Sequence, residues 1–340
     1  MKPVIIYPPT IDWNYLHQRP QQLLKTLAEF DCLCIFCNIN RENRYSKGFI
    51  TLSPNLILAN GQSFTTTVQW ARATFPNQPV VAYFTYPPHI AQIRASTVDL
   101  IIFDSVDEPV DFFSSWQPNY TESVKAADIV LATARSLVTR AQALTGNEIH
   151  LLPNGCDYDH FKNAQDRQYI KRMPFNGKKP IVGYIGAIAP WLDTELLNTM
   201  AYCLPEYEFV FIGPLLGRNW VSFPHTNMHY LGYREYCEVP KFLSNFAYCL
   251  IPFKITDMTK GVNPVKYWEY LASGVPILST PLPEINREYV TIVTEDMFPG
   301  FSPIPSARER EDRITLARDN SWKERARKLF QILSCKLQNG

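Results

Sequence analysis

Short apolar runs alternate with amphipathic stretches through the first half of the chain. Residues 4–7 form one such run, residues 18–30 follow with leucines at helical spacing, and residues 32–37 begin the next run. Strand-length runs separated by helix-like stretches are typical of a parallel sheet covered on both faces, so the pattern predicts an open α/β domain. Its other strands are expected at 56–59, 80–84, 100–103, 129–133 and 150–152, and its other helices at 67–74 and 136–145.

The strand pattern starts again at residue 181. Before it, the polar and basic stretch 162–180 has the composition of a linker. With 340 residues and 46% hydrophobic content, the chain is long enough for two domains, which we expect at 1–165 and 178–318. Residues 298–312 are predicted to be a turn-rich, charged connector to a last helix. The strands of the second half are expected at 181–186, 209–213, 228–232, 248–253, 275–280 and 290–293.

Residues 261–280 contain a complete helix with both ends marked, followed by a strand. Asn263 is expected to cap the helix, Pro264 suits its first position, and Gly274 suits the left-handed position after its last residue. The helix is therefore predicted from about 264 to 273. Lys266 and Glu269 are three residues apart and share a face away from the apolar positions.

Lys266 is unusually placed, because the first turn of a helix is already positive through its free N–H groups and the macrodipole. An anion would relieve this conflict, and phosphate groups bind at helix starts through these same N–H groups. Glu269, further along the helix, is then able to accept hydrogen bonds from ribose hydroxyls. The alternative is an ordinary solvated Lys266–Glu269 pair on the surface.

Two strand-to-helix loops give further candidates. The loop after residues 4–7 has no glycine, so it lacks the dinucleotide-binding fingerprint, and it places Arg19 near the carboxyl edge of the sheet. We interpret Arg19 as a cleft residue, and the alternative is an arginine paired with a nearby carboxylate. In the second half, Gly186 ends a strand where glycine lets the backbone approach a ligand closely, and Asp193 is expected to cap the next helix.

A group of carboxylates follows the strand 100–103. Asp104, Asp107 and Glu108 lie at the carboxyl end of that strand, where open α/β sheets bind ligands. A carboxylate here is able to act as a general base, or to accept a hydrogen bond from a bound ligand. We select Asp107 for this role, and the alternative is that these acids are solvated or cap helices.

Composition and charge exclude several classes of protein. Lys and Arg total 33 against 32 Asp and Glu, so the net charge of +1 gives no argument for a nucleic-acid partner. No apolar run approaches the ~20 residues that span a bilayer, and the first residues do not form a secretory signal, so we expect a cytoplasmic protein. The eight cysteines lie mostly in apolar stretches. Cys34 and Cys37 form a C-x-x-C, but strand alternation would point them to opposite faces, and no partner C-x-x-C or His pair is in range, so no metal site is expected.

The segment NPVKYWEYLASGVPILST resembles the nucleotide-sugar-binding helix of GT-B fold glycosyltransferases, in the branch with the pattern NP-x-K-x-x-EYLA-x-G-x-P. The segments QRP, VDE, LPNG-x-D, GYIGAI, IGP, LGYRE and NSW resemble the same family and extend the likeness over nearly the whole chain. The resemblance implies two doubly wound parallel-sheet domains facing an interdomain cleft, with the C-terminal helix 320–340 packing back on the N-terminal, acceptor-side domain. Gly261 is a departure, because many relatives carry there a glutamate that contacts the donor sugar.

The same resemblance implies where the donor binds. In that family the glutamate matching Glu269 binds the ribose, the preceding loop and helix start hold the diphosphate, and Arg218, or instead Lys254 or Lys260, neutralises phosphate. The residues expected at the donor site are Gly186, Ala187, Ile188, Gly213, Arg218, Tyr233, Val262, Asn263, Pro264, Val265, Lys266 and Glu269. Those expected on the catalytic, acceptor side are Arg19 and Asp107.

Together these expectations describe a glycosyltransferase that moves a sugar from a UDP- or GDP-sugar to a hydroxyl of a glycan or lipid-linked acceptor, in cell-surface polysaccharide or glycolipid synthesis. No metal and no cofactor besides the nucleotide-sugar co-substrate are expected, and the resemblance favours retention of configuration. The basic, amphipathic C-terminal helix is compatible with a peripheral contact to the inner face of a membrane. The alternatives are an epimerase of the UDP-sugar kind, in which water replaces the acceptor, and a catalytically inactive nucleotide-sugar-binding module.

Overall fold

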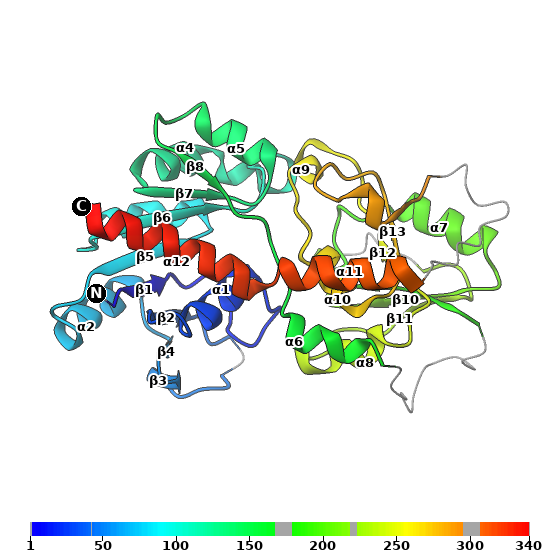
Figure 1. The fold of residues 1–340 in the computed structure, drawn as a ribbon, viewed down its shortest axis with the longest axis horizontal. Coiled ribbons are helices and arrows are strands. Elements are labelled where there is room, and N and C mark those ends of the chain that lie inside the picture. The colour runs from blue at the N-terminus through cyan, green and yellow to red at the C-terminus, as the bar shows by residue number, and fades with distance from the viewer. Residues whose placement is uncertain (1, 42, 167–178, 218–222, 295–306, 340) are drawn as a thin grey trace. The chain divides into compact units, whose positions relative to one another are not determined.

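The computed structural model describes residues 2–41, 43–166, 179–217, 223–294 and 307–339. By their contacts these residues form two compact units, and both chain termini belong to the first (Figure 1). The first unit contains Met1–Asn154, Gly261–Asn263 and Trp322–Gly340, and the second contains Gly155–Lys260 and Pro264–Ser321. Residues 155–165, which we expected in the first domain, therefore pack with the second unit.

The strands of the first unit form a single sheet. They are β1 (Val4–Tyr7), β2 (Leu33–Asn38), β3 (Gly48–Ser53), β4 (Leu56–Asn60), β5 (Val80–Phe84), β6 (Leu100–Ser105), β7 (Ile129–Ala132) and β8 (Ile149–Leu151). Their order across the sheet is β3-β4-β2-β1-β5-β6-β7-β8, and neighbours pair in parallel except that β3 runs antiparallel to β4. Every residue of β1, β2 and β5 is buried, which explains why their sequences are unbroken apolar runs.

Helices connect these strands, and the last helix of the chain returns to them. They are α1 (Arg19–Leu27), α2 (Phe64–Thr74), α3 (Ile90–Arg94), α4 (Gln117–Ala126), α5 (Arg135–Gln142) and α12 (Trp322–Asn339), with short 3-10 helices η1 (Pro87–His89) and η2 (Asp111–Trp116). Helix α12 packs along α1, where the rings of Phe30 and Phe330 lie 6.1 Å apart. Its apolar stripe, including Trp322 and Leu329, is buried in the first unit.

The second unit is built on a sheet whose described strands are all parallel. They are β9 (Ile181–Ile185), β10 (Glu208–Ile212), β11 (Met228–Tyr230), β12 (Tyr248–Ile251), β13 (Ile277–Ser279) and β14 (Thr291–Ile292), in the order β11-β10-β9-β12-β13-β14. Its helices are α6 (Tyr158–Phe161), α7 (Thr194–Cys203), α8 (Val239–Leu243), α9 (Asp257–Lys260), α10 (Val265–Ser273) and α11 (Ala307–Asp319), with η3 (Lys162–Ala164), η4 (Tyr236–Glu238) and η5 (Arg287–Tyr289).

The ends of two helices test the predicted caps. The Asp193 carboxylate accepts a hydrogen bond of 3.1 Å from the N–H of Leu196 and caps α7, as predicted. Gly274 adopts the left-handed conformation, with φ of 74°, and ends α10, as predicted. The capping role predicted for Asn263 is wrong, because Pro264 occupies the N-cap position and the Asn263 Oδ1 accepts instead from the N–H of Asn154, at 2.9 Å.

Helix α11 and strand β3 are among the elements that the apolar periodicity does not predict. The connector predicted at 298–312 is helical from Ala307 onward, as part of α11, and residues 298–306 lie outside the described residues. Helix α11 is polar on almost every side, so apolar spacing does not indicate it, yet Arg313 is buried and donates a 3.0 Å hydrogen bond to the Gly274 carbonyl. The edge strand β3 is also unpredicted, since its residues are only partly buried.

Candidate functional site

The turn after β9 comes close to the turn after β10 at the carboxyl edge of the second sheet. Gly186 and Gly213 both have positive φ, 152° and 142°. A Cβ atom on Gly213 would lie 1.9 Å from the Gly186 carbonyl oxygen, so only glycine fits there. These two glycines bring the turns together where ligands of parallel α/β sheets bind.

Lys266, in the first turn of α10, lies against Gly186. Its Cε and Nζ atoms are 2.8 and 3.2 Å from the position that a Cβ atom on Gly186 would take. The ammonium group lies 5.3 Å from the ring centroid of Tyr184 and 4.9 Å from that of Phe253, within range of cation–π attraction. Lys266 is half-buried, and among the described residues no carboxylate lies within ion-pair distance of it. The structure therefore holds a cation at the sheet edge that has no anionic partner of its own there.

Glu269 lies one turn further along α10 and is also half-buried. Within the described ranges, its carboxylate has no hydrogen-bond partner. A half-buried carboxylate in that state is available to hydrogen-bond donors of a ligand, such as hydroxyl groups. The predicted pair is thus present on α10, but it does not form the close ion pair that the surface alternative requires.

Burial perturbs both charges of this pair. Removal from water lowers the pKa of Lys266 to about 8, against the opposing attraction of Glu269. Burial also raises the pKa of Glu269 to about 7, which Lys266 opposes and Asp157 reinforces. Both residues therefore titrate near neutral pH, which is a frequent property of groups in functional sites.

Some backbone N–H groups of the described residues near Lys266 donate hydrogen bonds within the protein, and others do not. The N–H of Gly186 donates to the Ile212 carbonyl at 2.8 Å, and that of Ile188 donates to Pro214 at 2.9 Å. The Gly186 N–H is therefore occupied within the protein, and the place of Gly186 at the donor site stays a prediction. In the described part of the chain, the Ala187 N–H has no such partner, and the first amides of α10, at Val265 and Lys266, are free of helical bonds.

The remaining donor-site candidates do not all lie in the same unit, and one lies outside the described residues. Gly213 donates its N–H to the Gly232 carbonyl at 3.0 Å, and its own carbonyl accepts from the Tyr230 hydroxyl at 2.9 Å. Tyr233 is half-buried in the loop after β11. Arg218 lies outside the described residues. Val262 and Asn263 belong by their contacts to the first unit, whereas Pro264 and the rest of α10 belong to the second.

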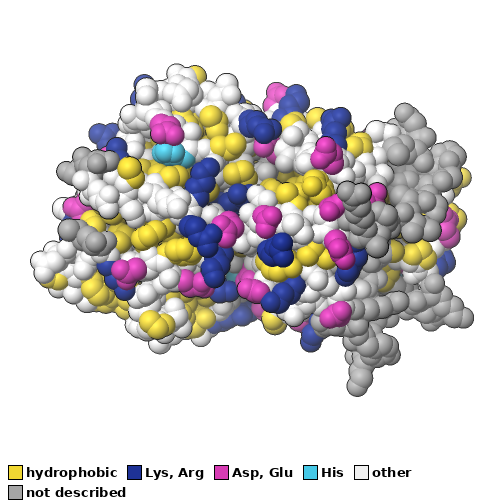
Figure 2. Space-filling model, in the orientation of Figure 1, with side chains coloured by type: hydrophobic (Ala, Val, Ile, Leu, Met, Phe, Trp, Pro, Cys, Tyr) yellow, Lys and Arg dark blue, Asp and Glu magenta, His cyan; other side chains and the backbone are white. Residues whose placement is uncertain are grey.

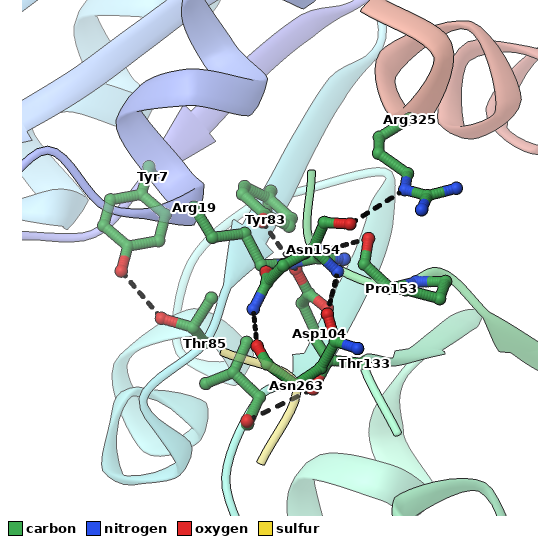
Figure 3. A network of polar contacts seen from close by, with 11 residues as sticks. Tyr7, Arg19, Tyr83, Thr85, Asp104, Thr133, Pro153, Asn154, Asn263 and Arg325 are labelled. Atoms are coloured by element: carbon green, nitrogen blue, oxygen red, sulfur yellow. Dashed lines mark hydrogen bonds and ion pairs between the residues drawn. The ribbon is translucent and has the colours of Figure 1, made fainter. Parts of the chain in front are cut away.

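In the first unit, Arg19 is the centre of a buried polar network (Figure 3). Its Nε and Nη2 donate to the two carboxylate oxygens of Asp104 at 2.6 and 3.1 Å, and the Tyr83 hydroxyl donates to the same carboxylate at 2.6 Å. Its Nη1 donates to the Pro153 carbonyl and to Asn154 Oδ1, both at 3.2 Å. Arg19 is 3% exposed and Asp104 is 0% exposed, so this ion pair is closed to solvent.

Asn154 extends this network to the end of the loop that precedes α10. Its side-chain amide donates to the Asn263 carbonyl at 2.6 Å, in addition to the backbone bond between the same residues. Its carbonyl accepts from Arg325 on α12 at 3.0 Å. The contacts of Arg19 are those of the paired arginine that we named as the alternative. Its predicted catalytic role stays a prediction without a contact in this structure that supports it.

Asp107 and Glu108 follow β6 but have different surroundings. Glu108 is buried and accepts a 2.5 Å hydrogen bond from the Nε of Arg140. Asp107 is half-buried, and burial together with the nearby Glu108 charge raises its pKa to about 7. A Cβ atom on Gly261 would lie 2.4 Å from the Cγ of Glu108, so the glycine at this departure from the family pattern is required by the close packing of Glu108.

Several contributors to these networks were not predicted from the sequence. Tyr184 and Phe253 flank Lys266, and Asn154 joins Arg19 to Asn263. The aromatic residues end or follow apolar strands, where they are indistinguishable from core residues by pattern. Asn154 stands in a Pro-Asn-Gly turn, and turn chemistry alone accounts for its presence.

Among the described residues, no group of three or more His, Cys, Asp or Glu side chains is arranged to hold a metal ion. No described helix combines the length and the apolar character that crossing a bilayer demands. On the face drawn in Figure 2, Lys and Arg side chains are interspersed with Asp and Glu, and on α12 Arg327 pairs with Glu324.

Both units are parallel-sheet α/β domains, and together they have the GT-B fold of nucleotide-sugar-dependent glycosyltransferases. The structure matches sucrose-phosphate synthase from Thermosynechococcus elongatus with a TM-score of 0.71 and 12% identity over 100% of both chains. It matches HepE of Anabaena, in complex with UDP and glucose, with a TM-score of 0.63 and 10% identity, over 98% of this chain and 100% of that one.

The sequence is similar to TuaH of Bacillus subtilis, whose name describes a glycosyltransferase of teichuronic acid biosynthesis. The two are 26% identical over 270 residues, which is 73% of this chain and 66% of TuaH. This chain therefore spans about two thirds of the length of that relative. No family model matches the chain.

Proposed function

We propose that this protein is a glycosyltransferase that moves a sugar from a nucleoside-diphosphate sugar to a hydroxyl acceptor. The observation that carries the proposal is the placement of Lys266 against Gly186, with its ammonium group free of any carboxylate in the described part of the second unit. A cation beside free amides at a helix start is suited to a diphosphate. The similarity to TuaH and the fold shared with a UDP complex support the same class of donor.

In this proposal α10 performs two tasks. Lys266 and the amides of Val265 and Lys266 neutralise the diphosphate, and so stabilise the charge that develops on the leaving nucleotide when the glycosidic bond breaks. Glu269 accepts hydrogen bonds from the ribose hydroxyls. Because positive side chains and amides supply this stabilisation, the reaction is proposed to need no metal ion.

Asp107 is proposed as the acceptor-side group. Its pKa of about 7 leaves a large fraction of the carboxylate ionised at neutral pH, so it is able to orient or deprotonate an attacking hydroxyl. Retention of configuration is proposed from the resemblance to retaining enzymes, and Asp107 then orients the hydroxyl. The acceptor is proposed to be a glycan or a lipid-linked glycan in cell-surface polysaccharide or glycolipid synthesis, with the enzyme at the cytoplasmic side.

The test is ligand-induced stabilisation of the full chain. UDP, GDP and a panel of UDP- and GDP-sugars are screened by thermal shift, because a ligand that binds only the folded state raises the melting temperature. We expect a shift with one nucleotide and its sugars, and loss of that shift in Glu269→Ala while the variant remains folded. No shift with any nucleotide at millimolar concentration would contradict the proposal.

The bound sugar nucleotide then identifies the reaction. A transferase consumes it mainly when an acceptor is present, whereas an epimerase of the UDP-sugar kind releases nucleotide and free sugar with water alone. An inactive binding module shows the thermal shift and no turnover under either condition. Chromatography of nucleotide products with and without an acceptor glycan separates these outcomes.

A further inference from the structure

Strand β9 loses one of its two neighbours before its last residue. Among the described residues, the last pair that β9 forms with β12 is Gly183 opposite Cys249. If this parallel register continued to Ile185, an N–H at position 252 would donate to the Ile185 carbonyl. Pro252 has no N–H, so the ladder ends there. On its β12 side, the last residue of β9 is therefore left without a strand as partner.

The hydroxyl of Tyr270, on α10, takes the place of that strand. The Ile185 N–H donates to the Tyr270 hydroxyl oxygen at 2.9 Å, and the same hydroxyl donates to the Ile185 carbonyl at 3.3 Å. One buried side chain thus satisfies both of the backbone groups that β12 leaves unpaired. It attaches α10 to the end of β9, although the two residues are 85 positions apart in the chain.

This attachment lies beside the proposed donor site. Ile185 directly precedes Gly186, and a Cβ atom on Gly186 would lie 2.8 Å from the Cε of Lys266. Tyr270 follows Lys266 by four residues on α10, so the two side chains lie on the same side of the helix. Tyr270 therefore bonds the residue before the turn, and Lys266 contacts the turn itself.

The other hydrogen bonds of this turn lead away from α10. The N–H groups of Gly186 and Ile188 donate to carbonyls at the end of β10 and in the loop after it. The Tyr184 hydroxyl donates to the Ala187 carbonyl at 2.8 Å, which closes the turn on itself. These bonds fix the shape of the turn and its place against β10, whereas the Tyr270 hydroxyl links it to α10.

We propose that Tyr270 is a positioning residue of the donor site, and that its hydroxyl holds the Gly186 turn against α10 so that the turn and Lys266 contact the same diphosphate. This inference rests on the proposed function and deepens it, because it names the bond that aligns two parts of the diphosphate site. Without the hydroxyl, the N–H and carbonyl of Ile185 lose their partner, and a ligand has to bring the turn and the helix together as it binds.

Binding of paired ligands to the full chain tests this inference. The pairs are UDP with uridine and GDP with guanosine, and the members of each pair differ only in the diphosphate. Tyr270→Phe keeps the ring and removes the hydroxyl, so the variant should fold, which thermal unfolding checks. For the pair that binds, we expect Tyr270→Phe to weaken the nucleoside diphosphate by about tenfold and the nucleoside by about twofold at most in a ligand-observed NMR titration.

Tyr120→Phe is the matched control. The Tyr120 hydroxyl is also buried and is hydrogen-bonded to the Ser105 hydroxyl at 2.9 Å, but it lies in the first unit. This variant loses a buried hydrogen bond as Tyr270→Phe does, and it should bind both ligands as the unmodified protein does. If Tyr120→Phe weakened the diphosphate as much as Tyr270→Phe, the effect would be one of general stability and the inference would fail.

A double-mutant cycle with Lys266→Met tests whether the hydroxyl acts together with Lys266. In the Lys266→Met protein, Tyr270→Phe should weaken the nucleoside diphosphate by about twofold at most, because one of the two aligned parts is already missing. An equal effect in both backgrounds, or equal weakening of the nucleoside and its diphosphate, would overturn the inference. Nucleotide binding that is insensitive to Tyr270→Phe removes this inference alone, whereas absence of nucleotide binding to the unmodified protein contradicts the proposed function as well.

Discussion

Each unit has a basic side chain and a carboxylate near the carboxyl edge of its sheet. The two pairs differ in whether the protein itself satisfies their charges. In the first unit, Arg19 is fully enclosed, and its guanidinium donates to Asp104, Pro153 and Asn154. In the second unit, Lys266 lies between two aromatic rings with no ion pair to any described carboxylate, and Glu269 is equally without a close partner.

The difference teaches which of the two pairs belongs to a ligand. A buried charge whose hydrogen-bonding capacity is filled within the protein stabilises that protein and has nothing left to offer a substrate. A half-buried charge with a perturbed pKa and unfilled capacity is destabilising on its own, and a ligand of opposite charge relieves that cost. On this ground we propose a structural role for the Arg19–Asp104 pair and donor binding for Lys266 and Glu269.

The largest expected effect is on the stability of the first unit. Arg19→Ala leaves the buried Asp104 carboxylate unpaired, and we expect the free energy of unfolding to fall by about 3–5 kcal/mol. Arg19→Lys keeps the charge but loses the two-pronged contact with Asp104. Its free energy of unfolding should therefore lie between those of the unmodified protein and Arg19→Ala. Urea denaturation of the three proteins measures this order. An Arg19→Ala protein that is as stable as the original and has lost only turnover would show that Arg19 is catalytic.

The next effect is on nucleotide affinity. We expect Lys266→Met to weaken UDP or GDP binding by about ten- to a hundredfold, because a charge-assisted contact to phosphate is lost, with the folded state retained. Isothermal titration calorimetry measures the affinity. Lys254→Met removes an exposed cation that precedes α10 in the sequence and is the matched control. The opposite ranking of these two variants would move the phosphate contact from Lys266 to the loop.

The sequence predicts the strands and helix ends that position these residues, but not the distant partners that satisfy some of them. The apolar runs locate the described strands other than β3 to within a few residues, because strands buried on both faces leave an unbroken hydrophobic signature. Helix caps are local as well, so Asp193 and Gly274 behave as predicted. Asn263 does not, because its best partner, Asn154, is 109 positions away in the chain and no local rule anticipates it.

The state of each charge is likewise a tertiary property. The sequence places Arg19 and Lys266 alike beside helix starts, and only the fold shows that Asp104, 85 positions from Arg19, fills one of them. The rings of Tyr184 and Phe253 that shield Lys266 come from two different strand ends. Spacing rules therefore find the candidate residues, whereas their satisfaction by neighbours distinguishes a site from a structural pair.

A smaller effect concerns the pH dependence of nucleotide binding. Lys266 attracts phosphate only when protonated, and its pKa is about 8, so affinity should decrease as the pH rises above 8. Glu269 accepts ribose hydroxyls best when ionised, and its pKa of about 7 should weaken binding below that pH. Calorimetry from pH 6 to pH 9 should show a maximum, with changes of several-fold on each side.

Lys266→Arg isolates the basic side of that profile. The guanidinium stays charged over this range, so the decrease above pH 8 should disappear even if the variant binds less tightly overall. The same titration corrects for any ionisation of the nucleotide itself. If the decrease persists in the Lys266→Arg protein, the titrating group is not Lys266, and the contrast with Arg19 loses its electrostatic basis.

The smallest effect extends the comparison to Asp107, a half-buried carboxylate on the first unit. Its pKa is about 7 in the folded protein against an ordinary value of 3.8, so the folded state favours the protonated form. Its contribution to stability is present below pH 4 and is lost as the pH rises to about 7. Asp107→Asn stays neutral at every pH. Relative to the unmodified protein, its free energy of unfolding should therefore rise by about 1–2 kcal/mol between pH 4 and pH 8, less than the full shift implies because the group is partly solvated.

Urea denaturation at both pH values measures this gain, with Glu29→Gln as an exposed control on the same unit. An equal stability difference at both pH values would place Asp107 with Asp104, as a carboxylate whose charge the protein already satisfies.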